Sequence, residues 1–220
     1  MQKRVDIHQE LLAADTAQAQ ANRLLFQARK ILAVHLVSSP GSGKTTLIEE
    51  TCSVLLSRYP VGVIVGDIKG CDDAHRLQKM GVDAVAIETE GLCHLEASMV
   101  AHAFSQLPSL QGGFLFIENV GNLVCPAFYD LGEALRVVLV SVPEGAEKPA
   151  KYPPLFRKAD LLLLTKKDLL PHFDFDAEAA VSYARAHHPR LAWGWVSART
   201  GEGMKEWLAF LESKAVSTSV

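Results

Sequence analysis

The chain has 220 residues, of which 49% are hydrophobic and 21% are charged, and its formal net charge is -3. This length and apolar content suffice for one sizeable hydrophobic core, whereas the balance of charges excludes the strongly basic composition of a general nucleic-acid binder. No apolar run approaches the roughly 20 residues of a membrane-spanning helix, and the first residues lack the apolar segment and cleavage site of a signal peptide. We therefore expect a cytoplasmic protein that binds neither nucleic acid nor membrane, and whose four cysteines are reduced thiols or metal ligands.

The predicted elements alternate between helix and strand along the chain. Residues 8–29 are rich in Ala, Leu and Gln, contain no Gly or Pro, and predict a helix. Apolar runs typical of buried parallel strands follow at 32–37, 61–66, 83–87, 114–117, 136–142, 160–164 and 191–196. Helices are expected at 44–58, 73–80, 93–106, 176–187 and 203–213.

This alternation predicts an α/β fold, a doubly wound and mainly parallel sheet with helices on both faces. We expect residues 1–30 to form an N-terminal helical arm, residues 31–214 one nucleotide-binding domain, and residues 215–220 a flexible tail. The segment 141–154, which proline residues interrupt repeatedly, is expected to be a surface loop.

The junction after the first predicted strand has the pattern of a phosphate-binding loop. Its residues are Gly41, Ser42, Gly43, Lys44, Thr45 and Thr46. Glycines let backbone N–H groups approach phosphate oxygens, Lys44 can reach the β- and γ-phosphates, and Thr45 offers a hydroxyl to Mg²⁺. The pattern departs at Ser38, where such loops have their first glycine. The alternative, a glycine-rich turn without a ligand, does not account for the strand before it and the helix after it.

A second motif indicates which base the nucleotide carries. Lys166 and Asp168 follow a predicted strand, and Ser197 and Ala198 follow the last one. The Asp168 carboxylate can accept two hydrogen bonds from guanine, a pattern that adenine does not offer, and the Lys166 stem can cover the base. The usual signature begins with Asn, and Thr165 replaces it here. We therefore expect GTP rather than ATP, although the Asn that usually ties the base loop to the phosphate loop is missing.

Acidic residues at two strand ends complete the expected nucleotide site. Asp67 is placed as a carboxylate that binds Mg²⁺ directly or through water. Asp73 is either a further Mg²⁺ ligand beside Thr45 or the N-cap of the next helix. Glu118 is expected to orient water or Mg²⁺, the alternative being a plain acid at a strand end, and Gly121 is free to rotate toward a γ-phosphate.

Thiols and an imidazole form a separate group of interest. Cys93 and His94 are expected to begin a helix, whose N-terminus would lower the pKa of the thiol, and Cys125 is a third donor in a loop. Such donors suit Ni²⁺ or Zn²⁺, and three of them leave one coordination position open for transfer. The alternative is a buried thiol beside a surface histidine. Cys52 is interpreted as a core residue and Cys71 as incidental.

Longer strings extend over nearly the whole chain and resemble one family. They are LVSSPGSGKTTL, GCDDAHR, GLCHLEASM, FIENVGNLVCPAFYDLGE, SVPEGAEKPAKYP and SARTGEGM. In these strings, and in its helical arm, the chain resembles the HypB family of hydrogenase-maturation GTPases. The resemblance implies a SIMIBI-class P-loop GTPase that hydrolyses GTP to GDP and phosphate. It also implies delivery of nickel to the large subunit of [NiFe] hydrogenase, together with a HypA-type metallochaperone.

The resemblance also implies roles for individual residues. Lys44, Asp67 and Glu118 would be catalytic, and Thr45, Asp67 and Asp73 would bind Mg²⁺. The metal ligands of the family match Cys93, His94 and Cys125, at a site where Ni²⁺ binds and Zn²⁺ competes. In the family GTP promotes a homodimer with the metal at its interface, and Lys148 is a candidate to reach the partner's nucleotide.

Two features of some family members are absent from this sequence, an N-terminal CxxCGC-type site and a histidine-rich segment. Cys125 follows Gly121 by four residues, so a loop that tightens around the γ-phosphate would shift the thiol. The rival functions are a urease-type nickel GTPase, whose Cys-Pro-His triplet is not found here, a P-loop nucleotide kinase and a metal-storage protein.

Overall fold

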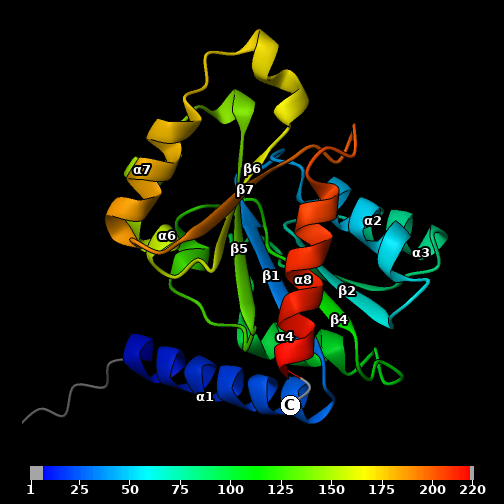
Figure 1. Cartoon of the computed structure of the whole chain (residues 1–220). Coiled ribbons are helices and arrows are strands. Elements are labelled where there is room, and N and C mark those ends of the chain that lie inside the picture. The colour runs from blue at the N-terminus through cyan, green and yellow to red at the C-terminus, as the bar shows by residue number, and fades with distance from the viewer. Residues whose placement is uncertain (1–6, 219–220) are drawn as a thin grey trace, which may run out of the picture.

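A single seven-stranded sheet, with every neighbouring pair parallel, forms the centre of the computed structural model, which describes residues 7–218 (Figure 1). Its order is β3-β2-β4-β1-β5-β6-β7. The strands are β1 (Leu32–Ser38), β2 (Val61–Asp67), β3 (Asp83–Glu88), β4 (Phe114–Glu118), β5 (Leu135–Ser141), β6 (Leu161–Thr165) and β7 (Ala192–Val196). This parallel sheet confirms the predicted α/β fold. Its inner strands are buried on both faces, which explains the continuous apolar runs in the sequence.

Helices cover both faces of the sheet. The longer ones are α1 (Ile7–Ala28), α2 (Lys44–Leu55), α3 (Asp72–Lys79), α4 (Ala97–Phe104), α7 (Ala177–His187) and α8 (Met204–Thr218). One face packs against α2, α3 and α8 through a cluster that includes Leu47, Leu77 and Trp207. On the opposite face α1 and α4 cover one half, and α6 (Pro153–Arg157) and α7 cover the other. None of the described helices has the length and apolar character to cross a membrane.

Helix α1 packs along α4 instead of projecting from the domain (Figure 1). Phe26 is buried against Phe104, with ring centroids 5.0 Å apart in an edge-to-face arrangement. The buried Asn22 side chain donates to the carbonyl oxygens of Ala97 and Leu131, at 2.8 and 3.0 Å. The division into arm, domain and tail stays a prediction. Helix α8 runs to Thr218 through most of the expected tail, whose last two residues lie outside the described part of the chain.

Two local predictions are wrong. Helix α4 begins at Ala97, not at residue 93, because its first turn is capped from α1, where the Asp15 carboxylate accepts a hydrogen bond of 2.8 Å from the Ala97 N–H. The segment 141–154 is not a plain loop. It contains a 3₁₀ turn (Val142–Glu144), helix α5 (Lys148–Lys151) and the start of α6, and its prolines occupy first-turn positions where no N–H partner is required.

The strand order reverses around β1, whose neighbours are β4 and β5. In open parallel sheets a crevice forms beyond the carboxyl ends of the strands at such a reversal, because the connections leave in opposite directions. The fold therefore places the loops that follow β1, β2, β4 and β6 along one edge of the sheet, and these loops carry the predicted nucleotide residues.

Candidate functional site

Two adjoining cavities occupy this crevice. A cavity of about 460 Å³ is lined, among others, by Gly41, Lys44, Thr45, Asp67, Asp73, Glu118 and Gly121. A second, of about 300 Å³, is lined by Ser42, Asp168, Ser197 and Ala198, and both cavities share Gly43, Thr46 and Lys166. The structure thus gathers every residue of the predicted nucleotide site along one continuous crevice, with phosphate-type residues in one cavity and base-type residues in the other.

The phosphate loop owes its shape to two glycines and a buried serine. Gly41 and Gly43 have φ of 72° and 93°, values that residues with a side chain rarely adopt. Helix α2 begins directly after Gly43. Ser38, at the position of the missing glycine, is the last residue of β1 and has no such backbone requirement. Its hydroxyl donates to the Ser39 carbonyl oxygen at 2.7 Å and accepts from the Lys44 ammonium at 3.2 Å. The departure from the usual pattern is therefore compatible with the loop.

Lys44 and Glu118 face each other inside the larger cavity. Both side chains are 93% buried, and the Lys44 Nζ lies 3.9 Å from Glu118 Oε1. Burial lowers the pKa of Lys44, and burial raises the pKa of Glu118 to about 7, since each charge loses water that the other does not fully replace. Glu118 is thus buried at the end of a central strand beside a cationic side chain. This environment disfavours the alternative that Glu118 is an ordinary solvated acid at a strand end.

A cluster of oxygen atoms surrounds the Thr45 hydroxyl. It lies 3.1 Å from Asp73 Oδ2 and 2.9 Å from Glu118 Oε1. Asp67 lines the same cavity, and its Oδ1 accepts a hydrogen bond of 3.3 Å from the Lys69 N–H. Glu118 Oε2 is buried and has no hydrogen-bond partner among the described residues. Hydroxyl and carboxylate oxygens are the donors that Mg²⁺ prefers, so this cluster fits the ion.

Asp73 does not act as a helix cap. The cap position of α3 belongs to Cys71, and Asp73 lies within the first turn. One of its carboxylate oxygens contacts Thr45 and the other accepts from Arg76 at 3.1 Å. The N-cap alternative is therefore wrong, and this carboxylate faces the phosphate loop.

The base cavity is tied to the phosphate loop by Thr165, the residue that departs from the usual signature. The Thr165 hydroxyl donates to the Ser42 carbonyl oxygen at 2.7 Å, and both residues are buried. Although the usual Asn is missing, threonine makes the tie from the end of β6. The Ser197 hydroxyl donates to Asp168 Oδ1 at 2.7 Å and thereby fixes the carboxylate.

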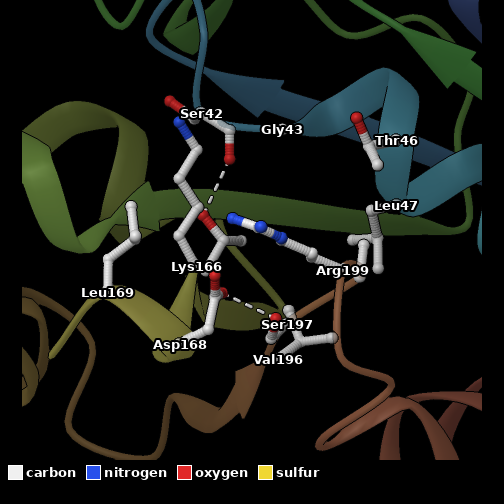
Figure 2. A pocket seen from close by; sticks show the side chains of 12 residues that line it. Ser42, Gly43, Thr46, Leu47, Lys166, Asp168, Leu169, Val196, Ser197 and Arg199 are labelled. Carbon is white, nitrogen blue, oxygen red and sulfur yellow. Dashed lines mark hydrogen bonds between the residues drawn. The ribbon is translucent and has the colours of Figure 1, made fainter.

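The sequence did not point to Arg199, which lines the same cavity. Figure 2 shows its side chain extending across the cavity toward Lys166. A charged residue in a glycine-rich turn is ordinarily solvated, so the only available signal was its place directly after Ser197 and Ala198.

Gly121 packs directly against the phosphate loop. A Cβ atom at this residue would lie 2.7 Å from Pro40 Cα and 2.8 Å from Pro40 N, and real Cβ atoms do not approach backbone so closely. Its φ is not in the left-handed region. The glycine is therefore needed for close approach between the segment after β4 and the phosphate loop.

Cys93, His94 and Cys125 come together from two loops. Their donor atoms all lie within 4.8 Å of one another, and the described residues contain no other group of three or more such donors. The Cys93 thiol lies 2.9 Å from the Cys125 sulfur and 3.9 Å from His94 Nδ1. The His94 ring stacks on Tyr129 with centroids 3.9 Å apart. His94 Nε2 is buried without a hydrogen-bond partner among the described residues and lies 3.8 Å from Glu96 Oε1, so Nδ1 is the ring nitrogen that faces the Cys93 sulfur.

The expected thiolate character of Cys93 is wrong for this structure. Because α4 begins at Ala97, Cys93 lies in the preceding loop and not at a helix N-terminus. The hydrogen bond to Cys125, followed by burial, raises the pKa of Cys93. Burial lowers the pKa of His94, which favours the neutral imidazole that metals bind. Cys125 is the first residue of a 3₁₀ turn (Cys125–Ala127), not part of an irregular loop.

The other predicted residues have simple environments. Cys52 is fully buried in α2, and burial raises the pKa of its thiol to about 12, as expected for a core residue. Cys71 is half-buried, with its sulfur 3.6 Å from His75 Nδ1. Lys148 begins α5, and its Nζ lies 3.8 Å from Glu144 Oε1 and 5.8 Å from the Tyr152 ring centroid.

Known proteins share the sequence and the fold of this chain. The sequence profile described as "CobW/HypB/UreG, nucleotide-binding domain" matches residues 32–192. The hydrogenase maturation factor HypB of Azotobacter chroococcum is 53% identical over 208 residues, which cover 94% of this chain and 68% of the relative. HypB of Escherichia coli K12 is 47% identical over 210 residues, covering 96% and 72%. The crystal structure of HypB from Helicobacter pylori in complex with nickel superimposes with a TM-score of 0.89 at 35% identity, covering 93% of this chain and 96% of that one.

Proposed function

Since this chain belongs to the HypB family, we propose that it is a GTP-hydrolysing metallochaperone that inserts nickel into the large subunit of [NiFe] hydrogenase in the cytoplasm. One observation carries the proposal. A single segment, from Glu118 to Cys125, runs from the phosphate cavity to the group of thiol and imidazole donors. A nucleotide site and a soft-metal site that share a segment are what a nucleotide-driven metal carrier requires.

The phosphate cavity supplies binding and charge stabilisation for hydrolysis. Backbone N–H groups of the loop and the N-terminus of α2 bind phosphate oxygens, and the Lys44 ammonium neutralises the β- and γ-phosphates. Thr45, Asp67 and Asp73 would hold Mg²⁺, which neutralises phosphate charge when bound. Glu118 is placed beside Thr45 to orient the attacking water. Positioning and charge stabilisation account for most catalysis of phosphoryl transfer, and these residues can supply both, which supports GTP hydrolysis as the reaction.

The base cavity supports guanine as the base. Asp168, held by Ser197, presents a fixed carboxylate to the two N–H donors of guanine. The Lys166 stem and the Arg199 guanidinium lie where they can cover the faces of the base, since a guanidinium stacks well on aromatic planes. Ala198 brings backbone to the same cavity.

Nickel is the cargo of this protein and not a resident cofactor. The Cys93, His94 and Cys125 donors suit Ni²⁺ and also Zn²⁺, because both favour sulfur and imidazole nitrogen. Three protein donors leave a position from which a recipient's ligand can take the metal. The ligands bind deprotonated, so the raised pKa of Cys93 makes metal binding weaken as pH falls.

Assembly of two copies is supported by exposed apolar side chains close in sequence to both sites. Ile68, Leu92, Val124 and Phe128 are 48%, 41%, 52% and 60% exposed. GTP would promote a homodimer through this surface by ordering the loops, and Lys148 would approach the partner's nucleotide. A HypA-type metallochaperone would supply the nickel. Sedimentation should show a monomer with GDP and a dimer with Mg²⁺ and a non-hydrolysable GTP analogue.

Metal titration tests the proposal directly. Ni²⁺ and Zn²⁺ are titrated separately into wild-type protein and into Cys93→Ala, His94→Ala and Cys125→Ala variants, with GDP and with the GTP analogue. We expect each variant to lose most of its metal affinity while hydrolysing GTP, whereas Lys44→Ala loses hydrolysis. Cys52→Ala, a buried cysteine outside the site, is the matched control. Metal affinity at wild-type level in all three variants would contradict the assignment.

A further inference from the structure

Two asparagines lie between the nucleotide residue Glu118 and the metal donor Cys125. Asn119 is buried directly after β4, and Asn122 is half-buried three residues later. Each makes a side-chain hydrogen bond to the backbone of the loop that carries Cys93 and His94. Asn119 Oδ1 accepts from the Leu95 N–H at 3.1 Å, and Asn122 Nδ2 donates to the Cys93 carbonyl oxygen at 3.1 Å.

These two bonds bracket His94. One holds the residue before it and the other holds the residue after it, so the loop is fixed at both sides of the imidazole. The two partners lie 24 and 29 residues from the asparagines in the sequence. They join the backbone of this loop to the segment after β4, in addition to the side-chain contacts of Cys93 with Cys125 and of His94 with Tyr129.

The Asn119 side chain is also held by His35, a residue of β1. Its Nδ2 donates to His35 Nε2 at 2.8 Å, which requires that the neutral His35 carries its proton on Nδ1. That nitrogen lies 3.1 Å from Glu133 Oε1, and the other Glu133 oxygen accepts from the Leu131 N–H at 2.8 Å. Every side-chain atom of Asn119 that forms hydrogen bonds is thus used within a buried network, which leaves the amide one orientation.

The oxygen and the nitrogen of the Asn122 amide each make one hydrogen bond. Its Oδ1 accepts from the Val124 N–H at 2.9 Å and closes a local turn that leads to Cys125. Its Nδ2 is the group that reaches the Cys93 carbonyl. One side chain therefore shapes the approach to one thiol and holds the backbone of the other.

We propose that Asn119 and Asn122 are positioning residues, which clamp the Cys93–His94 loop to the segment between Glu118 and Cys125 so that the three metal donors respond together to the nucleotide. The inference rests on the proposed function and adds the physical connection between its two sites. Without the clamp, the backbone of the Cys93–His94 loop would not be held to the segment that carries a change from Glu118 to Cys125. With it, both loops of the metal site shift as one unit, and metal affinity becomes linked to the nucleotide state.

The decisive variant is Asn122→Ser. Serine can still close the local turn before Val124, but its side chain is too short to reach the Cys93 carbonyl, and it adds no charge beside the metal donors. Ni²⁺ affinity is measured for wild type and variant with GDP and with a non-hydrolysable GTP analogue. In the variant we expect the ratio of the Ni²⁺ affinities in the two nucleotide states to be about fivefold smaller than in the wild type, and equal to one if the wild-type ratio is below five. A fivefold change corresponds to the net contribution of one hydrogen bond. Hydrolysis of GTP should be unchanged, because Asn122 does not line the nucleotide cavities.

Asn22→Ser is the matched control. Asn22 holds Ala97 and Leu131, which follow the same two metal loops, but it does so from α1 and not from the segment after β4. This variant should lose stability and some Ni²⁺ affinity equally in both nucleotide states, with an unchanged ratio. Asn119→Ala tests the second bond, and its effect on the ratio decides the question if Asn122→Ser does not fold.

The outcomes separate the two proposals. A wild-type protein that binds no Ni²⁺ or hydrolyses no GTP defeats the proposed function itself. If the wild type binds Ni²⁺ and hydrolyses GTP, but Asn122→Ser and Asn119→Ala both keep the wild-type ratio of Ni²⁺ affinities, the proposed function stands and the clamp is overturned. A ratio that falls equally in Asn22→Ser would also overturn it, since any loosening of the loops would then have the same effect.

Discussion

Thr165→Val tests whether the tie between the two halves of the nucleotide site is functional. The substitution keeps the shape of the side chain and removes the hydroxyl that donates to the Ser42 carbonyl oxygen at 2.7 Å. Threonine 165 is 4% exposed and Ser42 is fully buried, so water cannot readily replace the lost donor. An unsatisfied buried acceptor costs about 1–3 kcal/mol, and we expect the free energy of unfolding to fall by ~2 kcal/mol.

The effect on nucleotide affinity has an upper bound. The hydrogen bond joins two segments of the protein and does not itself contact the nucleotide, so most of its loss appears in folding stability. Binding weakens only to the extent that the phosphate loop must be ordered again, which limits the loss to ~2 kcal/mol or about 30-fold in the dissociation constant. Preference for guanine should persist, because Asp168 and Ser197 are untouched.

Denaturant unfolding and titration with a fluorescent GDP analogue measure the two quantities separately. Thr165→Ser retains the hydroxyl and should recover affinity for the nucleotide. A Thr165→Val protein that unfolds at the wild-type denaturant concentration and binds GDP as tightly as wild type would refute the reasoning, and the hydrogen bond would then be incidental.

Three further predictions concern single features of the site and its support. Asp168→Asn should weaken GTP binding by about 10- to 100-fold and improve binding of XTP, since the amide offers one acceptor instead of two; unchanged rejection of XTP in a competition assay would oppose this. Gly121→Ala should place its Cβ against the Pro40 backbone and weaken nucleotide binding at least as strongly as Thr165→Val does. Nucleotide affinity at the wild-type level in a titration would contradict this prediction. Unfolding stability should fall as pH drops below 6.5, because burial lowers the pKa of His35 and the unfolded chain takes up that proton first. It should fall further below pH 4.5, because burial raises the pKa of Glu133 but its interactions with His35 and Arg136 outweigh burial and hold that pKa well below its usual value. Stability that is flat from pH 7 to 4 in denaturant titrations would show that the buried network is not linked to folding.

The strands and the phosphate loop could be predicted from local sequence alone. Each of the seven strands lies within one residue of its predicted range. The five inner strands are buried on both faces, and such a strand needs a continuous apolar run. The loop before Lys44 is recognisable because its glycines adopt backbone conformations that other residues avoid. The thiol and imidazole donors were found and grouped by residue type, and the resemblance implied the same three ligands.

The start of α4 and the environment of Cys93 could not be read from local sequence. The cap of α4 comes from Asp15, 82 residues away, and moves the helix start beyond His94. The pKa of Cys93 is therefore set by contact with Cys125, in the opposite direction from that expected at a helix N-terminus. Arg199 was missed for a related reason, since only the packed loops show that its side chain lies in a cavity.

The sequence by itself determined the order of the strands and helices along the chain, the chemistry of the phosphate loop and the choice of metal donors. These depend on backbone preference and side-chain type, which neighbouring residues decide. The tertiary structure alone decided that Thr165 ties two loops 123 residues apart and that Asn119 and Asn122 hold the metal loop. Such contacts depend on how helices and strands pack against one another, and a hydrogen bond between distant segments leaves no periodic trace in either of them.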